Sequence, residues 1–401
     1  MFDPERYRDL FPILRSKTHL ANCSQGPLSV PVMHAIQEYE DSLIEFGLDW
    51  DRWMERVREA KAAFASLIGA STDDIAVLSS VSDTVSAIAS CLPIRGRTRV
   101  VTTVNEFPTV GHGWLAGAGR ENVTFISSPD GFYTPRVVEP ALGDETAILS
   151  MHFVAYYNGA LQDVAELAKV AHQHDALIFV DAYQGLGTVP LDVRESDLDF
   201  VVCGNLKYLL GLPGIAFMYV RPEFSDELEP AMTGWFGRVN PFSFDPTQLD
   251  YAPGARRFDM GTPPIPAAYA AAAGMRLIGE IGVREIYRHV QSISQGVIDG
   301  ALERGLEVAS PLDVTRKGAT TAIRVGAPQS ALIEQAMRRR GIIVAARADV
   351  IRIAPHFFTR ASEVTTALDV LQEVLQESGV TAALVSDDDA GVTYRVAPLG
   401  Q

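Results

Sequence analysis

The chain has 401 residues, of which 47% are hydrophobic, and a formal net charge of -16. This length and apolar content suffice for the core of one large domain, or of a large and a small one. The negative charge excludes a broad basic face for tracking a phosphate backbone, so we expect a small-metabolite partner and no nucleic acid. Three cysteines at irregular spacing form neither a disulfide framework nor a CxxC metal site, which favours a reducing, cytoplasmic location and no metal.

Neither end of the chain indicates export or a membrane. The N-terminal MFDPERYRDLFPIL is charged from its start and lacks the apolar region of a signal peptide. The longest apolar stretch, PAAYAAAAGM, is too short to cross a bilayer, which needs about 20 residues. The residues from about Ser386 onward combine three aspartates with glycine and are typical of a frayed tail. We expect a soluble protein with no membrane partner.

The first strong element is a helix from Arg52 to Gly69, where apolar residues recur at helical spacing and a glycine ends the run. Short β-rich runs then alternate with helical ones: IAVLSS before DTVSAIASCL, RVVTTV before a loop, TAILSMHF before DVAELAKVAHQHD, and finally ALIFVDA. This alternation predicts an α/β fold with a parallel sheet covered by helices on both faces. Ligands of such sheets bind at the carboxyl ends of the strands.

The pattern changes around Glu285. A long helical run, IYRHVQSISQGVIDGALERG, precedes the strand-like TTAIRVG and VIRIAPHF, with helical segments between and after them. We interpret this part as a second, smaller α/β domain. The predicted division is a large domain over residues 19–284 and a small domain made of residues 1–18 plus 285–401.

Two charged residues follow buried strand runs in the segments ALIFVDAYQ and DFVVCGNLKYLLGLPG. Asp181 ends the first run, and Lys207 follows the second by a few residues, so both are expected at one edge of the sheet. A charge at the end of an apolar strand is costly to desolvate without a partner. A cationic heteroaromatic ring between the two would supply one. Pyridoxal 5′-phosphate (PLP) requires such a pair, an amine for a Schiff base and a carboxylate for the pyridine nitrogen.

These strings resemble the cofactor-binding core of the class V aminotransferases. The resemblance covers nearly the whole chain, since THLANCSQGPLS, NEFPTV, GWFG, RRFDMGTPPI and RIAPHFF stand in the family's order. It implies the fold of fold-type I PLP-dependent enzymes, with a mainly parallel seven-stranded sheet in the large domain and a smaller C-terminal α/β domain. The family includes cysteine desulfurases, kynureninases and isopenicillin N epimerase-like proteins.

The resemblance implies a role for each matching position. Lys207 and Asp181 become the catalytic residues, the first as the Schiff-base lysine and the second as the partner of the pyridine nitrogen. The implied cofactor contacts are Ser79, Ser80, Val81, Phe107, His152, Asn158, Asp181, Gln184, Lys207 and Thr262. Without the resemblance, helix capping is the favoured explanation of the serines, and core packing would explain Phe107. Thr262 matches a segment that reaches the neighbouring subunit's phosphate, which implies a homodimer with a shared active site.

A second set of positions matches the substrate side: Arg352, Asn22, Ser24 and Trp235. Arg352 falls at the family's carboxylate-binding arginine, whose guanidinium can donate two parallel hydrogen bonds. An exposed arginine on an edge strand is the alternative interpretation. Asn22 and Ser24 could equally be loop-forming residues, and Trp235 could be part of the core.

Departures from family patterns narrow the expected reaction. Cysteine desulfurases need a cysteine on the loop before Arg352, where this chain has AARADVIR. Kynureninases have tyrosine and histidine where Leu206 and Gln184 stand. We therefore expect an enzyme that removes the Cα proton of a small amino acid. An aminotransferase is the first choice, a PLP-dependent C–X lyase the second and an epimerase the third. A degenerate, non-catalytic binding protein is the alternative outside enzymes, and an oxidoreductase is disfavoured because no GxGxxG follows a strand.

Overall fold

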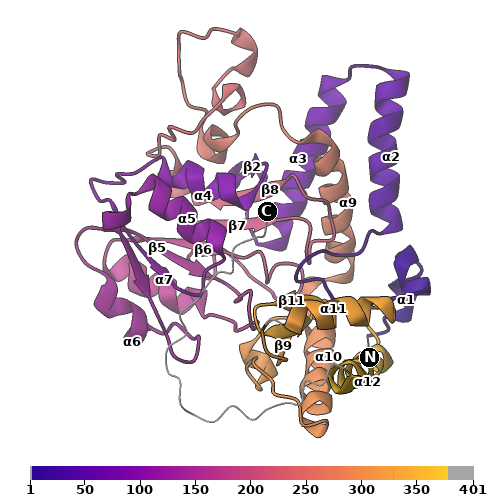
Figure 1. Ribbon diagram of the computed structural model, residues 1–401. Helices are drawn as coiled ribbons and strands as arrows, with labels where there is room; N and C mark the ends of the chain where they lie inside the picture. The colour runs from indigo at the N-terminus through magenta and orange to yellow at the C-terminus, as the bar shows by residue number, and fades with distance from the viewer. Residues whose placement is uncertain (1, 328, 378–401) are drawn as a thin grey trace, which may run out of the picture.

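The computed structural model describes residues 2–327 and 329–377, and a seven-stranded sheet lies at its centre (Figure 1). The strands run in the order β2-β8-β7-β6-β5-β3-β4. They are β2 (Ile75–Leu78), β3 (Arg99–Thr103), β4 (Val123–Ile126), β5 (Thr146–His152), β6 (Leu177–Asp181), β7 (Phe200–Gly204) and β8 (Ala216–Val220). Strand β8 is antiparallel to β2 and β7, and the other neighbours pair in parallel. The predicted mainly parallel sheet is confirmed, and the reversal of β8 was not predicted.

Helices cover both faces of this sheet, because successive side chains of each strand point to opposite sides. In β6, Ile178 and Val180 belong to the same buried cluster as helices α3 (Trp50–Leu67), α7 (Val164–Gln173) and α9 (Ile265–Ile281). Phe179, between them, packs with α4 (Val81–Ala89) and α5 (Pro108–Gly117) instead. The continuous apolar run of this strand therefore follows from burial on both faces.

Helix α5 corrects the sequence interpretation, which placed a loop after RVVTTV. The segment carries a proline at its first position and glycines at 111, 113 and 117, which are weak helix formers. Its helical form is stabilised by packing: Trp114 is fully buried against Phe179, and its indole N–H donates to Ser150 Oγ at 2.8 Å. The helix predicted from Arg52 does end near Gly69, whose φ is +71°.

The C-terminal part has its own layers. Helices α10 (Val283–Glu303), α11 (Gln329–Arg339) and α12 (Ala361–Glu377) pack on one face of a three-stranded sheet of β11 (Ala345–Arg347), β12 (Val350–Ile353) and β9 (Thr321–Arg324). A separate apolar cluster fills the space between them. The remaining α-helices and strands of the described residues are α1 (Glu5–Arg8), β1 (Thr18–His19), α2 (Val30–Glu45), α6 (Pro135–Val138), α8 (Pro222–Ser225) and β10 (Ile342–Ile343).

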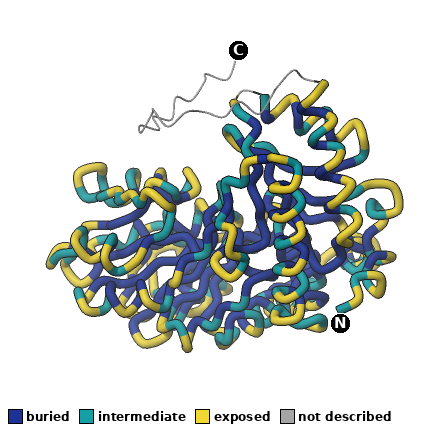
Figure 2. Tube along the Cα trace, turned by 90° about the horizontal axis from the view of Figure 1, so that it is seen from below, coloured by how far each residue is buried: buried dark blue, intermediate teal, exposed yellow. Residues whose placement is uncertain are grey.

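The N-terminal segment is tied to this C-terminal part. Strand β1 pairs in parallel with β10, and Arg8 forms an ion pair with Glu363 at 2.8 Å. Figure 2 shows buried segments running through the interior of both parts, with exposed segments at their surface. The predicted domain boundaries remain a prediction, and the tail from Ser386 lies outside the described residues. Within residues 2–327 and 329–377, no helix is long and apolar enough to span a membrane.

Candidate active site

Three neighbouring parallel strands end at one edge of the sheet and bring the predicted residues together. His152 ends β5 and stands opposite Asp181, which ends β6. Lys207 follows β7 by three residues. A small cavity at this edge is lined by Phe107, His152, Val154, Tyr156, Asp181, Tyr183, Gln184 and Lys207. Five of the predicted cofactor-site residues therefore share one cavity.

The Asp181 carboxylate and the Lys207 amine perturb each other inside this cavity. Burial raises the pKa of Asp181 to about 6, with a further contribution from the negative charge of Glu106. The backbone N–H of Tyr183 donates to Asp181 Oδ1 at 2.9 Å. Burial lowers the pKa of Lys207 to about 8, against the opposing effect of Asp181. A substantial fraction of Lys207 is thus neutral, and hence nucleophilic, near neutral pH.

Several buried polar atoms around the cavity have no hydrogen-bond partner within the described part of the chain. They include Gln184 Oε1, Asn22 Oδ1 and Arg352 Nε. The other ends of these groups are fixed: Gln184 Nε2 donates to Cys23 O at 3.0 Å, and Asn22 Nδ2 donates to Ala354 O at 2.7 Å. Buried polar groups are rarely left unpaired, so these atoms mark positions where a polar ligand would complete the site.

The predicted phosphate-binding turn lies at the start of α4. Ser80 is the N-cap, and its Oγ accepts from the backbone N–H of Asp83 at 3.2 Å. Ser82 Oγ lies 2.6 Å from Thr109 Oγ1, in the first turn of α5. Two helix N-termini therefore meet beside the exposed Ser79. Their first N–H groups lack intrahelical partners and favour an anion.

Arg352 lies where three segments meet. It is 1% exposed, and its Nη1 donates to Tyr156 O at 2.8 Å while Nη2 donates to Ser24 Oγ at 3.1 Å. Both acceptors are neutral oxygens. Cross-strand pairing places Arg347 on the same face of the small sheet, and burial together with the charge of Arg352 lowers the pKa of Arg347. This corner is suited to an anion such as a carboxylate.

Like the residues of the phosphate-binding turn and Arg352, three further predicted site residues do not line the cavity. Asn158 forms a local turn, in which its Oδ1 accepts from Ala160 N at 3.1 Å. Trp235 packs its ring 6.4 Å from that of Trp50 and does not line the cavity. Thr262 is exposed in the loop before α9. The role implied for Thr262 depends on a neighbouring subunit, and this role and the substrate-side role implied for Trp235 remain predictions.

The sequence interpretation missed Tyr183, whose ring lies 4.0 Å from Lys207 Nζ. This ring fills the space beside Gly204, where an added Cβ would stand only 2.2 Å from Tyr183 Cζ. A glycine at the end of an otherwise bulky, buried strand was the available signal. Tyr156, Glu106 and Gln162 were also missed, because their contacts join distant segments.

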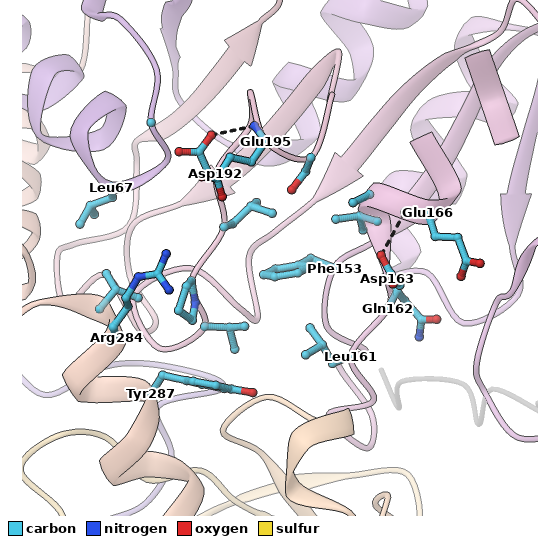
Figure 3. A pocket seen from close by; sticks show the side chains of 18 of the residues that line it. Leu67, Phe153, Leu161, Gln162, Asp163, Glu166, Asp192, Glu195, Arg284 and Tyr287 are labelled. Atoms are coloured by element: carbon cyan, nitrogen blue, oxygen red, sulfur yellow. Dashed lines mark hydrogen bonds between the residues drawn. The ribbon is translucent and has the colours of Figure 1, made fainter. Parts of the chain in front are cut away.

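A larger groove, of about 1070 Å³, lies elsewhere between the two parts of the molecule (Figure 3). Its wall combines apolar side chains such as Leu161 and Phe153 with the acidic Asp163 and Glu166. Figure 3 shows Gln162 between Leu161 and Asp163 on this wall. Lys207 and Asp181 do not line the groove, so we place the candidate chemistry in the smaller cavity.

Comparison with solved structures identifies the fold. A cysteine desulfurase from Thermococcus onnurineus NA1 superimposes with a TM-score of 0.84 at 22% identity, covering 94% of this chain and 99% of that chain. A C-DES mutant with glycine covalently linked to the PLP cofactor gives a TM-score of 0.83 at 20% identity, covering 91% and 99%. This is the fold of fold-type I PLP-dependent enzymes, as expected.

Sequence comparison then gives the family. Residues 32–362 match the Aminotransferase class-V family, and the chain belongs to it. An uncharacterized aminotransferase, YcbU, from Bacillus subtilis is 40% identical over 366 residues, which are 91% of this chain and 96% of that protein. A probable cysteine desulfurase from Methanothermobacter thermautotrophicus is 29% identical over 72% of this chain and 73% of its own. A kynureninase from Pseudomonas fluorescens is 24% identical over 80% of each chain. The exclusion of these two reactions therefore stays a prediction.

Proposed function

We propose that this protein is a PLP-dependent aminotransferase for a small amino acid, with the cofactor bound covalently to Lys207. The observation that carries the proposal is the placement of a partly neutral lysine and a buried carboxylate in one cavity at the carboxyl edge of the sheet. The 40% identical relative named as an aminotransferase supports the choice of reaction, and the PLP-linked neighbour supports the choice of cofactor.

The described residues fit PLP group by group. Asp181 would pair with the pyridine nitrogen, and the N-terminus of α4 would hold the phosphate. Gln184 Oε1, which has no hydrogen-bond partner among the described residues, would meet a ring substituent. When bound, PLP supplies an electron sink for the bonds to the substrate's α-carbon. Phe107 lines the same cavity, where its ring would shield one side from water.

The chain's own residues would then direct which bond breaks. Arg352 would receive the substrate carboxylate through its Nε–H, which has no partner in the described part of the chain, and so fix the α-carbon relative to the ring. Lys207, with its lowered pKa, would accept the proton from the substrate's α-carbon and return a proton to the adjacent carbon of the cofactor. Transamination needs both transfers. Elimination or epimerisation would begin from the same proton removal, which keeps a C–X lyase and an epimerase as the alternatives.

The assembly and location belong to the same proposal. We propose a cytoplasmic homodimer in which Thr262 of one subunit approaches the phosphate site of the other. Its exposed position ahead of α9 is compatible with such a contact. Trp235 would belong to the shared substrate pocket.

The cofactor assignment is tested by reducing the holoenzyme with borohydride and mapping the modified lysine by mass spectrometry. The label should fall on Lys207 and disappear in Lys207→Ala, while the surface variant Lys169→Ala keeps it. Lys317 is an internal control, because burial lowers its pKa to about 7 and its Nζ donates only to Gly318 O within the described residues. Label on Lys317 instead, or a protein that takes up no PLP, would refute the assignment.

The reaction class needs a separate measurement. With an amino donor alone, an aminotransferase converts its cofactor stoichiometrically to the pyridoxamine form, which remains on the enzyme. A lyase returns the cofactor to its starting form and releases product. A panel of amino acids followed by absorbance and mass spectrometry distinguishes the two, and no pyridoxamine with any donor would exclude the aminotransferase.

A further inference from the structure

A second carboxylate, Glu106, is buried beneath the candidate site. The residue is 6% exposed, and neither of its oxygens has a hydrogen-bond partner among the described residues. Its nearest cationic or imidazole nitrogen is His152 Nδ1, 3.4 Å from Oε1. A buried carboxylate is costly unless a donor or a positive charge faces it. The state of His152 therefore decides how Glu106 is stabilised.

The other side of His152 faces Gln162, whose amide orientation is fixed twice. Gln162 Oε1 accepts from the backbone N–H of Tyr133 at 2.9 Å, and Nε2 donates to Gly131 O at 3.0 Å. If the amide were flipped, its nitrogen would face the backbone N–H of Tyr133, and its oxygen would face the carbonyl oxygen of Gly131. Both contacts would then be unfavourable. The group 3.3 Å from His152 Nε2 is therefore the amide nitrogen, which can only donate.

This geometry determines the protonation of the imidazole. His152 Nε2 must accept from Gln162 and cannot carry a hydrogen, so the single ring proton lies on Nδ1, which is 3.4 Å from Glu106 Oε1. We propose that Glu106 and Gln162 are positioning residues that hold His152 as a neutral, Nδ1-protonated imidazole beside Asp181. This inference deepens the proposed cofactor site.

The consequence concerns the charge available to a ligand. The ionisable groups that act on Asp181 include Glu106, Lys207 and His152, and the Tyr183 and Cys203 side chains also interact with its charge. With His152 neutral, no histidine cation competes for the Asp181 carboxylate, which is left for the cationic ring of a cofactor. Glu106 adds a second negative charge behind it. Glu106 and neutral His152 therefore make the cavity more favourable for a bound cation.

The tautomer can be observed directly by ¹⁵N NMR on protein labelled at histidine, with His152→Asn used to assign the signal. We expect the Nδ1–H pattern in the wild type. In Gln162→Glu an acceptor replaces the donor at Nε2, so His152 should become doubly protonated. Gln173→Glu, an exposed glutamine at the end of α7, is the matched control and should leave the signal unchanged. An Nε2–H or doubly protonated ring in the wild type would overturn the proposal.

A second readout uses the visible absorption band of the loaded enzyme. Removing the negative charge in Glu106→Gln should move the pH midpoint of the band down by about one unit, because a cation in the cavity loses a buried counter-charge. The surface variant Glu121→Gln should leave the midpoint in place. Equal midpoints in Glu106→Gln and wild type would refute the electrostatic role. Neither measurement requires turnover, so failure of the aminotransferase proposal would leave both interpretable, and the NMR result does not require cofactor.

Discussion

The lowered pKa of Lys207 makes a prediction about how fast the cofactor attaches. Only the neutral amine can attack the aldehyde carbon of PLP. The rate of covalent attachment to the apoenzyme should therefore follow the neutral fraction of Lys207, rising with pH and levelling off above about 8. An ordinary lysine would instead rise until about 10.5.

The size of the effect follows from these two values. At about pH 7.5 an amine with a pKa of about 8 is roughly one quarter neutral, whereas one with the ordinary value is about one part in a thousand neutral. The cavity thus supplies about a 200-fold larger population of the reactive amine at this pH.

Stopped-flow absorbance after mixing apoenzyme with PLP measures this rate across the pH range. Two charge changes should move the inflection in opposite directions. Asp181→Asn removes the charge that raises the pKa of Lys207 and should lower the inflection. Arg352→Gln removes a charge that lowers this pKa and should raise it. Lys169→Ala serves as the control. A rate that continues to climb beyond about pH 10, or charge variants that leave the inflection in place, would refute the reasoning.

Three further predictions concern substrate binding, the cavity wall and stability. Arg352→Lys loses the planar donor set, and KM for the amino donor should rise about 10- to 100-fold with a smaller change in kcat; an unchanged KM contradicts the carboxylate role. Gly204→Ala should displace Tyr183, because the new Cβ would stand 2.2 Å from the Tyr183 ring. PLP binding, measured by absorbance titration, should weaken about tenfold or more, and adding Tyr183→Ala should recover part of the loss. Tight PLP binding by the single variant would count against this contact. The hydrogen bond from His172 to Asp199 raises the pKa of His172, so its stabilisation is present at lower pH and lost as pH rises. His172→Gln should therefore lower the urea-unfolding free energy, by less than about 1 kcal/mol, more at about pH 6 than at about pH 8.5, and the opposite order would disprove the sign.

The parts of the fold that sequence predicted well are those with one dominant cause. Strand β6 reads as an uninterrupted apolar run because helices cover both its faces. Helix α5 was missed because its glycines and Pro108 have poor intrinsic propensity, and Trp114 stabilises it through tertiary contacts. The direction of β8 was also unpredictable, since its buried composition is the same in either orientation.

The candidate site divides in the same way. Asp181 and Lys207 stand at the ends of apolar runs, so their placement at one edge could be inferred from strand direction alone. Glu106 and Gln162 are single polar residues outside the strands, and they meet only through His152. Glu106 lies 46 positions before His152 and 56 before Gln162, and no local sequence pattern links residues so far apart. Tyr183 lies two positions after the predicted Asp181 in the sequence. Its position in the cavity could not be predicted, because it depends on the space left by Gly204 at the end of the neighbouring strand β7.

The pairing of β1 with β10 has a consequence for how the molecule is made. Residues 18 and 19 lie beside residues 342 and 343, and Asn22 is held by the carbonyl oxygen of Ala354. On the ribosome these early residues emerge long before their partners. The central sheet can form first, as domains commonly do during synthesis. The hydrogen bond between Ser24 and Arg352 can form only once Arg352, in the last fifth of the described chain, has been synthesised. Premature termination between β8 and β12 would thus leave a chain that contains every strand of the central sheet but lacks the corner that we assign to the substrate carboxylate.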